Sequence, residues 1–399
     1  MKPNLNTLKP AVVIPAYRRH DALRRLLRSV NEADYPDAGC TLIISLEGGA
    51  EEEVIRVAED FEFQHGDKEI VRHSDKLGLK AHIYECAGYS QKYGSIIVLE
   101  EDLVVSPAYY HFAVRALQAY QNSESVAGIS LYAQRFNETA QLPFEPMPSY
   151  FAGYFMKLAC SWGQAWTAEQ WEAYQKWARE NPVPLQIDDV RIPKNIREWP
   201  AESWKREFNC YLLQKGRTIF YPYHSLTTNS SHYGGEHMKG TGSLFEVPLV
   251  HTIDGLEYLQ FPKSENAMIS YDLYMEANGS YVENVTGFNG SEVTLDLYGT
   301  KPLELLKKEN FIFTSKKIDD PIQSYALKLK PIEWNLKNHL KDHSTNAFFS
   351  LVESKKIIEY SVRRWAYIQL AIHCGTNRLG SSRLVWNNLL FQLKEYLKS

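Results

Sequence analysis

The sequence lacks the features that mark membrane-spanning, secreted, zinc-binding or nucleic-acid-binding proteins. No window approaches 18 uninterrupted apolar residues, so no transmembrane segment is expected. The cysteines number five and include no CxxC pair, which disfavours both a disulfide framework and a zinc site. The opening MKPNLNTLKPAVVIP has no charged region followed by an apolar one, so it does not resemble a signal peptide. A net charge of -4 without a basic block disfavours a nucleic-acid partner.

These absences leave a cytoplasmic protein with unpaired thiols as the expectation. The length of 399 residues predicts two domains, or one large domain with an appendage. We place a first domain over residues 1–245, divided at about residue 135, and an extension over 246–399 that is largely helical after about residue 320. A segment with aromatic and basic residues at 359–373 allows peripheral contact with the inner face of a membrane, although an ordinary packed helix explains it as well.

Strand and helix patterns alternate along the first domain. Short apolar runs rich in β-branched residues predict strands at 11–15, 41–46, 69–73, 95–99 and 126–131. Helical spacing predicts helices at 21–33, 51–61 and 79–94, and another opened by Ser106 and Pro107. This alternation predicts an α/β fold with a mostly parallel sheet flanked by helices. Ligands of such sheets bind outside the carboxyl ends of the strands, which here carry PAYRR, EGGA and an acidic triplet.

The acidic triplet consists of Glu100, Glu101 and Asp102, directly after the fourth strand. A solvated strand end is the simple explanation. However, adjacent carboxylates at a ligand-binding rim are costly unless a cation neutralises them. Side chains leaving a strand alternate in direction, so at most two of the three can face one point. Mg²⁺ or Mn²⁺ is typically held by one or two carboxylates and the phosphates of a substrate, which predicts metal-assisted displacement at a phosphate-bearing substrate.

Several motifs in order give the sequence a resemblance to a known family. AVVIPAYRR, a carboxylate after the second strand and the triplet followed by LVVSP resemble the GT-A fold of nucleotide-sugar glycosyltransferases, in which a DxD metal motif occupies the triplet's place. The stretches SWGQAWTAEQW, WPAESW and SSHYGGEH extend the resemblance over about residues 11–245. The sequence is most similar to the N-acetylglucosaminyltransferase I type and to related bacterial family 2-like enzymes.

The resemblance implies a donor site. It gives Pro15, Ala16 and Tyr17 as walls of the nucleotide pocket, Arg18 as a diphosphate contact and Glu47 as a contact to uracil or ribose. It also implies that Lys76 (or Lys80) binds phosphate and that Asp102 binds the metal. Glu100 and Glu101 would lie on the donor side, with Glu101 near the sugar or a metal-bound water. Strand-end packing, a plain turn at the EGGA segment and a solvated lysine are the structural alternatives.

The resemblance also implies an acceptor site and a general base. It implies that Trp162, Gly163, Trp166 and Trp204 contact the acceptor, with core packing as the alternative. It also places His237 and the neighbouring His232 in a loop near the phosphate or metal. In the similar eukaryotic enzymes the base is an Asp directly after the helix tryptophan. Lys205 stands at that position here, so Glu207 or Glu202 is the expected base.

The expected activity is metal-dependent transfer of a sugar, with Mn²⁺ or Mg²⁺, from a UDP-sugar to a saccharide or lipid-linked glycan, with inversion. Such a reaction belongs to polysaccharide or glycan biosynthesis. One rival, a sugar nucleotidyltransferase, would need a glycine-rich loop after the first strand, and PAYRRHD contains no glycine. The other rival is an inactive glycan-binding or scaffold protein, an interpretation that Lys205 keeps open.

Overall fold

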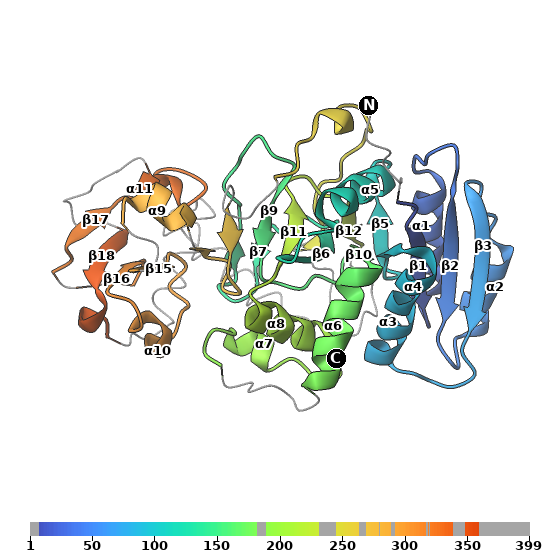
Figure 1. Cartoon of the computed structure of the whole chain (residues 1–399), viewed down its shortest axis with the longest axis horizontal. Coiled ribbons are helices and arrows are strands. Elements are labelled where there is room, and N and C mark those ends of the chain that lie inside the picture. Colours follow the sequence, from blue (N-terminus) through green and yellow to red (C-terminus); the bar gives the residue numbers. More distant parts are fainter. Residues whose placement is uncertain are drawn as a thin grey trace, which may run out of the picture.

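The computed structural model describes residues 8–181, 189–230, 245–262, 269–278, 280–288, 292–316, 318, 320–337 and 348–358. Its first half is a parallel sheet whose centre is apolar (Figure 1). The strands run in the order β3-β2-β1-β4, and every neighbouring pair is parallel. Their bounds are β1 Ala11–Ala16, β2 Cys40–Leu46, β3 Gly66–Arg72 and β4 Ser95–Val98. The strands predicted for this region are therefore confirmed.

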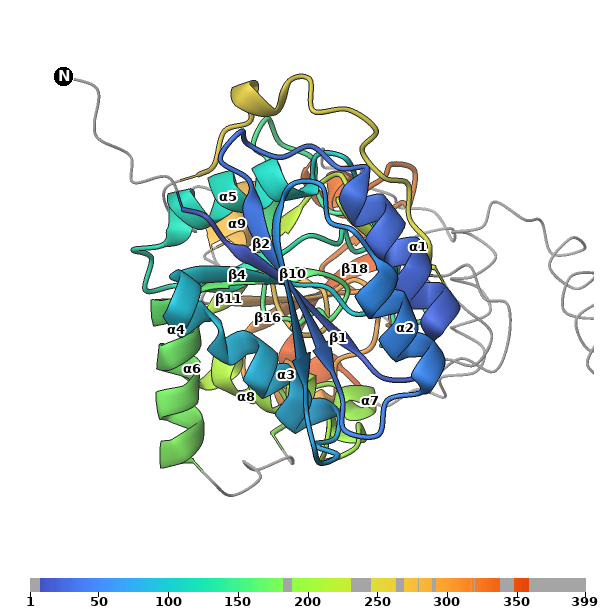
Figure 2. The same ribbon diagram turned by 90° about the vertical axis from the view of Figure 1, so that its right-hand side faces the viewer.

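Helices cover both faces of this half. Figure 2 shows α1 and α2 on one side of the strands, with α3 and α4 on the other. The first of them buries Leu23, Leu26, Leu27 and Val30, which recur at helical spacing and so form one apolar face. The bounds are α1 His20–Asn31, α2 Glu52–Asp60, α3 Leu79–Gly88 and α4 Ser90–Tyr93.

The second half continues the same sheet with strands of both directions. Beyond β4 the order is β10-β6-β11-β9-β13-β14, and β10 is antiparallel to both of its neighbours. The bounds are β6 Val126–Ser130, β9 Gly153–Met156, β10 Gln164–Thr167, β11 Thr218–Pro222, β13 Ser270–Tyr271 and β14 Ala277–Asn278. The predicted class, a large and mostly parallel sheet flanked by helices, is confirmed.

Three longer helices and several short elements complete this half. Thr167 caps α6, since its hydroxyl accepts from the backbone N–H of Gln170 at 3.2 Å and the Gln170 side chain accepts from the backbone N–H of Thr167 at 3.1 Å. Helix α8 ends at Gly216, where φ is +64°. The bounds are α5 Tyr109–Tyr120, α6 Ala168–Glu180, α7 Lys194–Arg197, α8 Trp204–Lys215, β5 Leu103–Val105, β7 Phe136–Asn137, β8 Leu142–Pro143, β12 Thr227–Asn229 and η2 Leu256–Tyr258.

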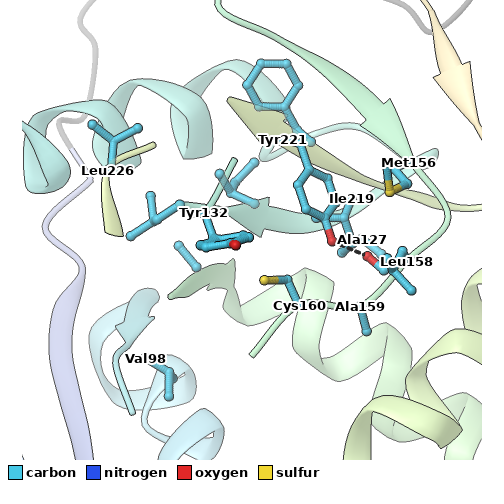
Figure 3. Packing of buried hydrophobic residues seen from close by; sticks show 14 of the residues in the cluster. Val98, Ala127, Tyr132, Met156, Leu158, Ala159, Cys160, Ile219, Tyr221 and Leu226 are labelled. Carbon is cyan, nitrogen blue, oxygen red and sulfur yellow. Dashed lines mark hydrogen bonds between the residues drawn. The ribbon is translucent and has the colours of Figure 1, made fainter. Parts of the chain in front are cut away.

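Aromatic side chains fill the core of the second half. Figure 3 shows Tyr132, Tyr221 and Cys160 among aliphatic neighbours, with the Tyr221 hydroxyl donating to the carbonyl of Leu158 at 2.7 Å. The free thiols of Cys40, Cys86, Cys160 and Cys210 are all buried, as the odd cysteine count suggested. Aromatic rings carry much of the apolar area that a core of this size can bury.

The extension forms a second, smaller sheet at the opposite end of the molecule from β3 (Figure 1). Its strands run in the order β15-β16-β18-β17. We expected mainly helix after residue 320, but the described residues there supply two of these strands and only short helices; residues 359–399 lie outside the described part. The bounds are β15 Val293–Asp296, β16 Phe311–Thr314, β17 Gln323–Tyr325, β18 Phe349–Glu353, α9 Ser280–Thr286, α10 Leu303–Leu306, α11 Trp334–Lys337 and η4 Ser354–Lys356.

An ion pair and a hydrogen bond join the second sheet to the edge of the first. The Lys301 ammonium, 5% exposed, lies 2.6 Å from the carboxylate of Asp272, which follows β13. The fully buried Asp296 carboxylate accepts from the backbone N–H of Lys301 at 2.9 Å, and Glu276 accepts from the N–H of Tyr298 at 2.7 Å. Each of these three acids thus has a hydrogen-bond or ion-pair partner, either in the other sheet's segment or in its own.

No helix within the described residues is both long enough and apolar enough to cross a membrane.

Candidate active site

The acidic triplet lies at the carboxyl end of β4, and an arginine from the turn between β1 and α1 is bound to it. The Nε of Arg19 donates to Glu101 Oε1 at 2.9 Å, and its Nη1 donates to Asp102 Oδ2 at 2.8 Å. All three side chains are mostly buried, with 26%, 12% and 13% of their surface exposed in that order. The sequence analysis gave Arg18 a role in binding and did not select Arg19. The direction of two adjacent arginine side chains depends on the turn after the strand, which the sequence does not show.

Glu100, the first acid of the triplet, faces a different cation. Burial first, and then the negative charge of Asp102, raise the pKa of Glu100 to about 8, while the Lys205 ammonium acts in the opposite direction. Burial also raises the pKa of Glu101, against the influence of Arg19. Three carboxylates are therefore held together with two protein cations, Arg19 and Lys205.

The segment after the triplet is fixed to a distant part of the chain. The backbone N–H and the hydroxyl of Ser230 both donate to the carbonyl of Asp102, at 2.9 and 2.8 Å. Antiparallel pairing of β5 with β12 continues this contact. His232 and His237, which follow directly, lie outside the described residues. Ser230, the last described residue before them, lies next to the triplet.

A second cluster surrounds the ring of Tyr17. The Arg18 guanidinium carbon lies 4.5 Å from the ring centroid, and the Lys76 Nζ lies 5.3 Å from it. Arg18 is largely exposed and 3.9 Å from Glu51. Pro15 and Ala16, the last residues of β1, are buried in the sheet. The residues predicted for the nucleotide pocket are thus close together at one rim, with two cations beside an aromatic ring.

Glu47 holds the loop that carries Lys76. Its Oε1 accepts from the backbone N–H groups of Gly48 at 3.0 Å and Leu77 at 2.7 Å, and its Oε2 accepts from Gly78 at 3.0 Å. The residue is 5% exposed. Gly48 is required where the two loops meet, since a Cβ there would lie 2.1 Å from the backbone carbon of Asp75. The Glu47 carboxylate therefore faces backbone amides within the protein.

Two histidines, the buried His82 and the partly exposed His73, lie beside this loop. The Ser45 hydroxyl is hydrogen-bonded to His82 Nε2 at 2.8 Å and to His73 Nε2 at 3.0 Å. His82 Nδ1 lies 3.7 Å from Glu47 Oε2. Burial lowers the pKa of His82 to about 4, although the Glu47 charge acts to raise it. His82 is therefore neutral in the folded protein at pH values where an exposed histidine is already charged.

We expect the protein to lose stability in mild acid because of His82. Because the pKa of His82 is lower in the folded chain than the ordinary 6.5, its contribution is present above pH 6.5 and is lost as the pH falls toward 4. We expect the free energy of unfolding to decrease by about 2 kcal/mol between about pH 7.5 and pH 5 through this group. Urea unfolding at both pH values measures it. His82→Gln should flatten the profile, whereas the same change at the more exposed His111 should not; an equally steep profile in His82→Gln would contradict the assignment.

The predicted acceptor residues divide into an exposed part and a buried part. Trp166 and Trp204 are each 2% exposed and pack against each other with ring centroids 6.1 Å apart. Trp166 also lies against Gly128, where a Cβ would come within 2.6 Å of its ring. Gly163 is buried too, with φ of +89°. Of the four predicted residues, the partly exposed Trp162 is therefore the one positioned to meet a ligand.

Lys205 lies between two tryptophans near the triplet. Its Nζ is 4.8 Å from the ring centroid of Trp199 and 5.7 Å from that of Trp162. Sequence reasoning quoted Trp199 within a motif but did not select it. The lysine at the position of the expected base thus lies against two aromatic rings, and its charge acts to lower the pKa of Glu100.

Glu207 and Glu202, the two candidate bases, occupy different environments. Glu207, in the first turn of α8, receives the ammonium of Lys80 on Oε2 and the hydroxyl of Tyr174 on Oε1, the latter at 3.2 Å. Glu202 precedes the helix and is exposed. Glu207 is thus an oriented carboxylate between α3, α6 and α8, and a base role requires one of its partners to move.

The triplet fits a hard divalent cation by its chemistry. Asp102 Oδ1 is buried and has no hydrogen-bond partner among the described residues, so an oxygen is left over after Arg19 has bound Oδ2. Within the described part of the chain no group of three or more His, Cys, Asp or Glu residues is arranged to hold a metal. One or two carboxylates completed by substrate phosphates is the arrangement typical of Mg²⁺.

Comparison with known proteins yields only distant structural likeness. No protein-family model matches the sequence, and no curated protein does. Among solved structures, S. aureus TarS 1-349 in complex with UDP is 10% identical, with a TM-score of 0.36 over 55% of this chain and 59% of that one. The mannosyltransferase PcManGT from Pyrobaculum calidifontis, in complex with GDP-Man and Mn2+, is 12% identical, with a TM-score of 0.38 over 57% and 59%. GalNAc-T7 with UDP, GalNAc and Mn2+ is 14% identical, with a TM-score of 0.37 over 55% and 43%.

The chain therefore spans about three fifths of the length of the first two proteins. At these identities and scores, the activities of the matched proteins do not transfer to this chain. Its function has to be argued from its own residues.

Proposed function

We propose that this chain is a metal-dependent glycosyltransferase that moves a sugar from a nucleotide donor, UDP-linked, to a saccharide hydroxyl with inversion. The observation that carries the proposal is the acidic triplet at the rim of a parallel sheet, with a buried and unpartnered oxygen on Asp102. Around it the rim supplies the Tyr17 cluster on one side and the Trp162 and Trp199 wall on the other. The motifs resemble the N-acetylglucosaminyltransferase I type, and the acceptor class follows from it: a saccharide or lipid-linked glycan.

Each region has a role in this reaction. Tyr17 stacks on the base, and Arg18 and Lys76 bind the diphosphate, since both cations lie beside its ring. Asp102, with Glu101, would hold Mn²⁺ or Mg²⁺, which when bound offsets the charge developing on the leaving diphosphate. Trp162 and Trp199 offer flat apolar surfaces to the acceptor sugar. Glu207 takes the proton of the attacking hydroxyl.

A donor screen tests the proposal directly. The melting temperature of the protein is measured with a panel of nucleotide-sugars, each with and without Mn²⁺, and the donor that stabilises most in the presence of metal is then incubated with saccharide acceptors. We expect a UDP-sugar to give the largest metal-dependent shift, because ligand binding to the folded state alone raises its stability. Absence of any metal-dependent shift across the panel would contradict the proposal.

A glycan-binding protein without catalysis is the second candidate. The observation that favours it is the replacement of the expected base by Lys205, together with the engagement of Glu207 by Lys80 and Tyr174. Slow hydrolysis of the donor in the absence of acceptor separates the two: a transferase releases UDP in a metal-dependent manner, whereas a binding protein does not.

A sugar nucleotidyltransferase would instead form a nucleotide-sugar from a nucleotide triphosphate and a sugar phosphate.

Replacement of Glu47 is expected to act through the loop that it holds. Glu47→Ala leaves three backbone N–H groups without their acceptor and should lower the free energy of unfolding by about 3 kcal/mol. Because Lys76 moves with the loop, affinity for UDP and for bare diphosphate should fall together. Calorimetry with both ligands and urea unfolding measure these effects. Weaker binding of UDP with unchanged binding of diphosphate would instead assign Glu47 to the base or ribose.

A further inference from the structure

Arg19 places a permanent positive charge where a metal ion would be bound. Its guanidinium binds Glu101 Oε1 and Asp102 Oδ2 with two hydrogen bonds of 2.9 and 2.8 Å. An arginine side chain keeps its charge at any pH of interest, and a planar fork bound to two carboxylates is a strong, geometrically specific contact. Two of the four oxygens of these carboxylates are therefore occupied before any metal arrives.

A divalent cation entering at Asp102 Oδ1 must approach this guanidinium closely. The two oxygens of one carboxylate lie only about 2 Å apart, so the cation and the Arg19 head group would share a carboxylate in a largely buried site. Like charges at such a separation repel strongly where solvent screening is weak. The metal consequently binds with high affinity only when the Arg19 head group moves away from Asp102.

We propose that Arg19 is an internal counter-ion that controls the metal affinity of the acidic triplet, and that the donor diphosphate draws it away. This inference rests on the proposed function for the identity of the anion. About a quarter of the Arg19 side chain is exposed at the rim, so it can reach an anion bound beside Tyr17. A diphosphate offers the guanidinium the same bidentate geometry as the two carboxylates. Nucleotide and metal then bind cooperatively, and each raises the affinity of the other by the same factor.

The test measures Mn²⁺ binding without any turnover. Free Mn²⁺ is followed by electron paramagnetic resonance during titration of the whole chain, at one fixed pH for all variants. The proposal predicts weak binding by the wild type and at least about tenfold tighter binding by Arg19→Gln, which removes the competing charge. Arg19→Lys, which keeps the charge but not the fork, should lie between them. UDP should enhance Mn²⁺ binding several-fold less in Arg19→Gln than in the wild type.

Arg18→Gln is the matched control, since it removes the same charge from the next residue, which is exposed and near Glu51. Its Mn²⁺ affinity without nucleotide should equal that of the wild type. Circular dichroism and melting temperatures establish that each variant folds, and Mn²⁺ should raise the melting temperature of Arg19→Gln more than that of the wild type. Unchanged or weaker Mn²⁺ binding by a folded Arg19→Gln would overturn the proposal. Tighter binding without any effect of UDP would support the counter-ion role and count against the nucleotide-sugar function.

Discussion

Asp102→Asn is expected to abolish the enhancement of UDP binding by Mn²⁺ and to lower turnover by roughly 10²-fold or more. The substitution keeps the shape of the side chain and removes the charge from the carboxylate of the triplet whose Oδ1 is buried and has no partner among the described residues. Calorimetric titration with UDP, in the presence and absence of Mn²⁺, gives the enhancement as a ratio of dissociation constants.

Asp21→Asn provides the comparison. This exposed aspartate of α1 is paired with Arg24 at 2.8 Å, so the same chemical change is made at a surface ion pair. Its metal enhancement and turnover should match the wild type, because exposed ion pairs contribute little. If Mn²⁺ enhances UDP binding equally in Asp102→Asn and in the wild type, the metal does not bind at the triplet.

Glu207→Gln is expected to lower turnover by roughly 10²-fold while leaving donor affinity nearly unchanged. The amide cannot accept the proton of the attacking hydroxyl, but it retains an oxygen for Lys80 or Tyr174. The measurement is the rate at saturating donor and acceptor, corrected for the folded fraction. That correction matters because Glu207 also links α8 to α3 and α6, and the variant should melt a few degrees lower.

Two further variants separate catalysis from structure. Glu198→Gln changes an exposed glutamate 3.6 Å from Lys194 and should retain the full rate. Glu202→Gln tests the alternative base in the turn before α8. A folded Glu207→Gln that retains near-wild-type turnover would exclude Glu207, and the rate of Glu202→Gln would then decide whether this region supplies the base.

The sequence predicted elements whose signals are local. The runs at 11–15 and 41–46 are mostly apolar because β1 and β2 are covered by helices on both faces, and such runs can be recognised without knowledge of the partner strand. The Thr167 cap and the end of α8 at Gly216 are likewise set by neighbouring residues. In the extension, strands of three to five residues pair across long separations, and their patterns resemble short helices.

Side-chain direction at the candidate site could not be read in the same way. Arg18 and Arg19 are adjacent and chemically identical, yet one contacts Tyr17 and Glu51 while the other binds the triplet. Trp162 precedes β10 and is partly exposed, whereas Trp166 lies within the strand and is buried. These differences arise from the turn and the pairing partner, which a single sequence does not encode locally.

The contacts between the two sheets bear on how the chain can be divided. A chain ended between β14 and β15 would lose Lys301 and the backbone N–H of Tyr298, which are the partners of Asp272 and Glu276. The same cut removes residues that pack over both acids, so water would replace these partners. It would also uncover β14, the last strand of the large sheet, whose free edge could then pair with another molecule. We therefore expect a chain shortened at this point to be less soluble than the full chain.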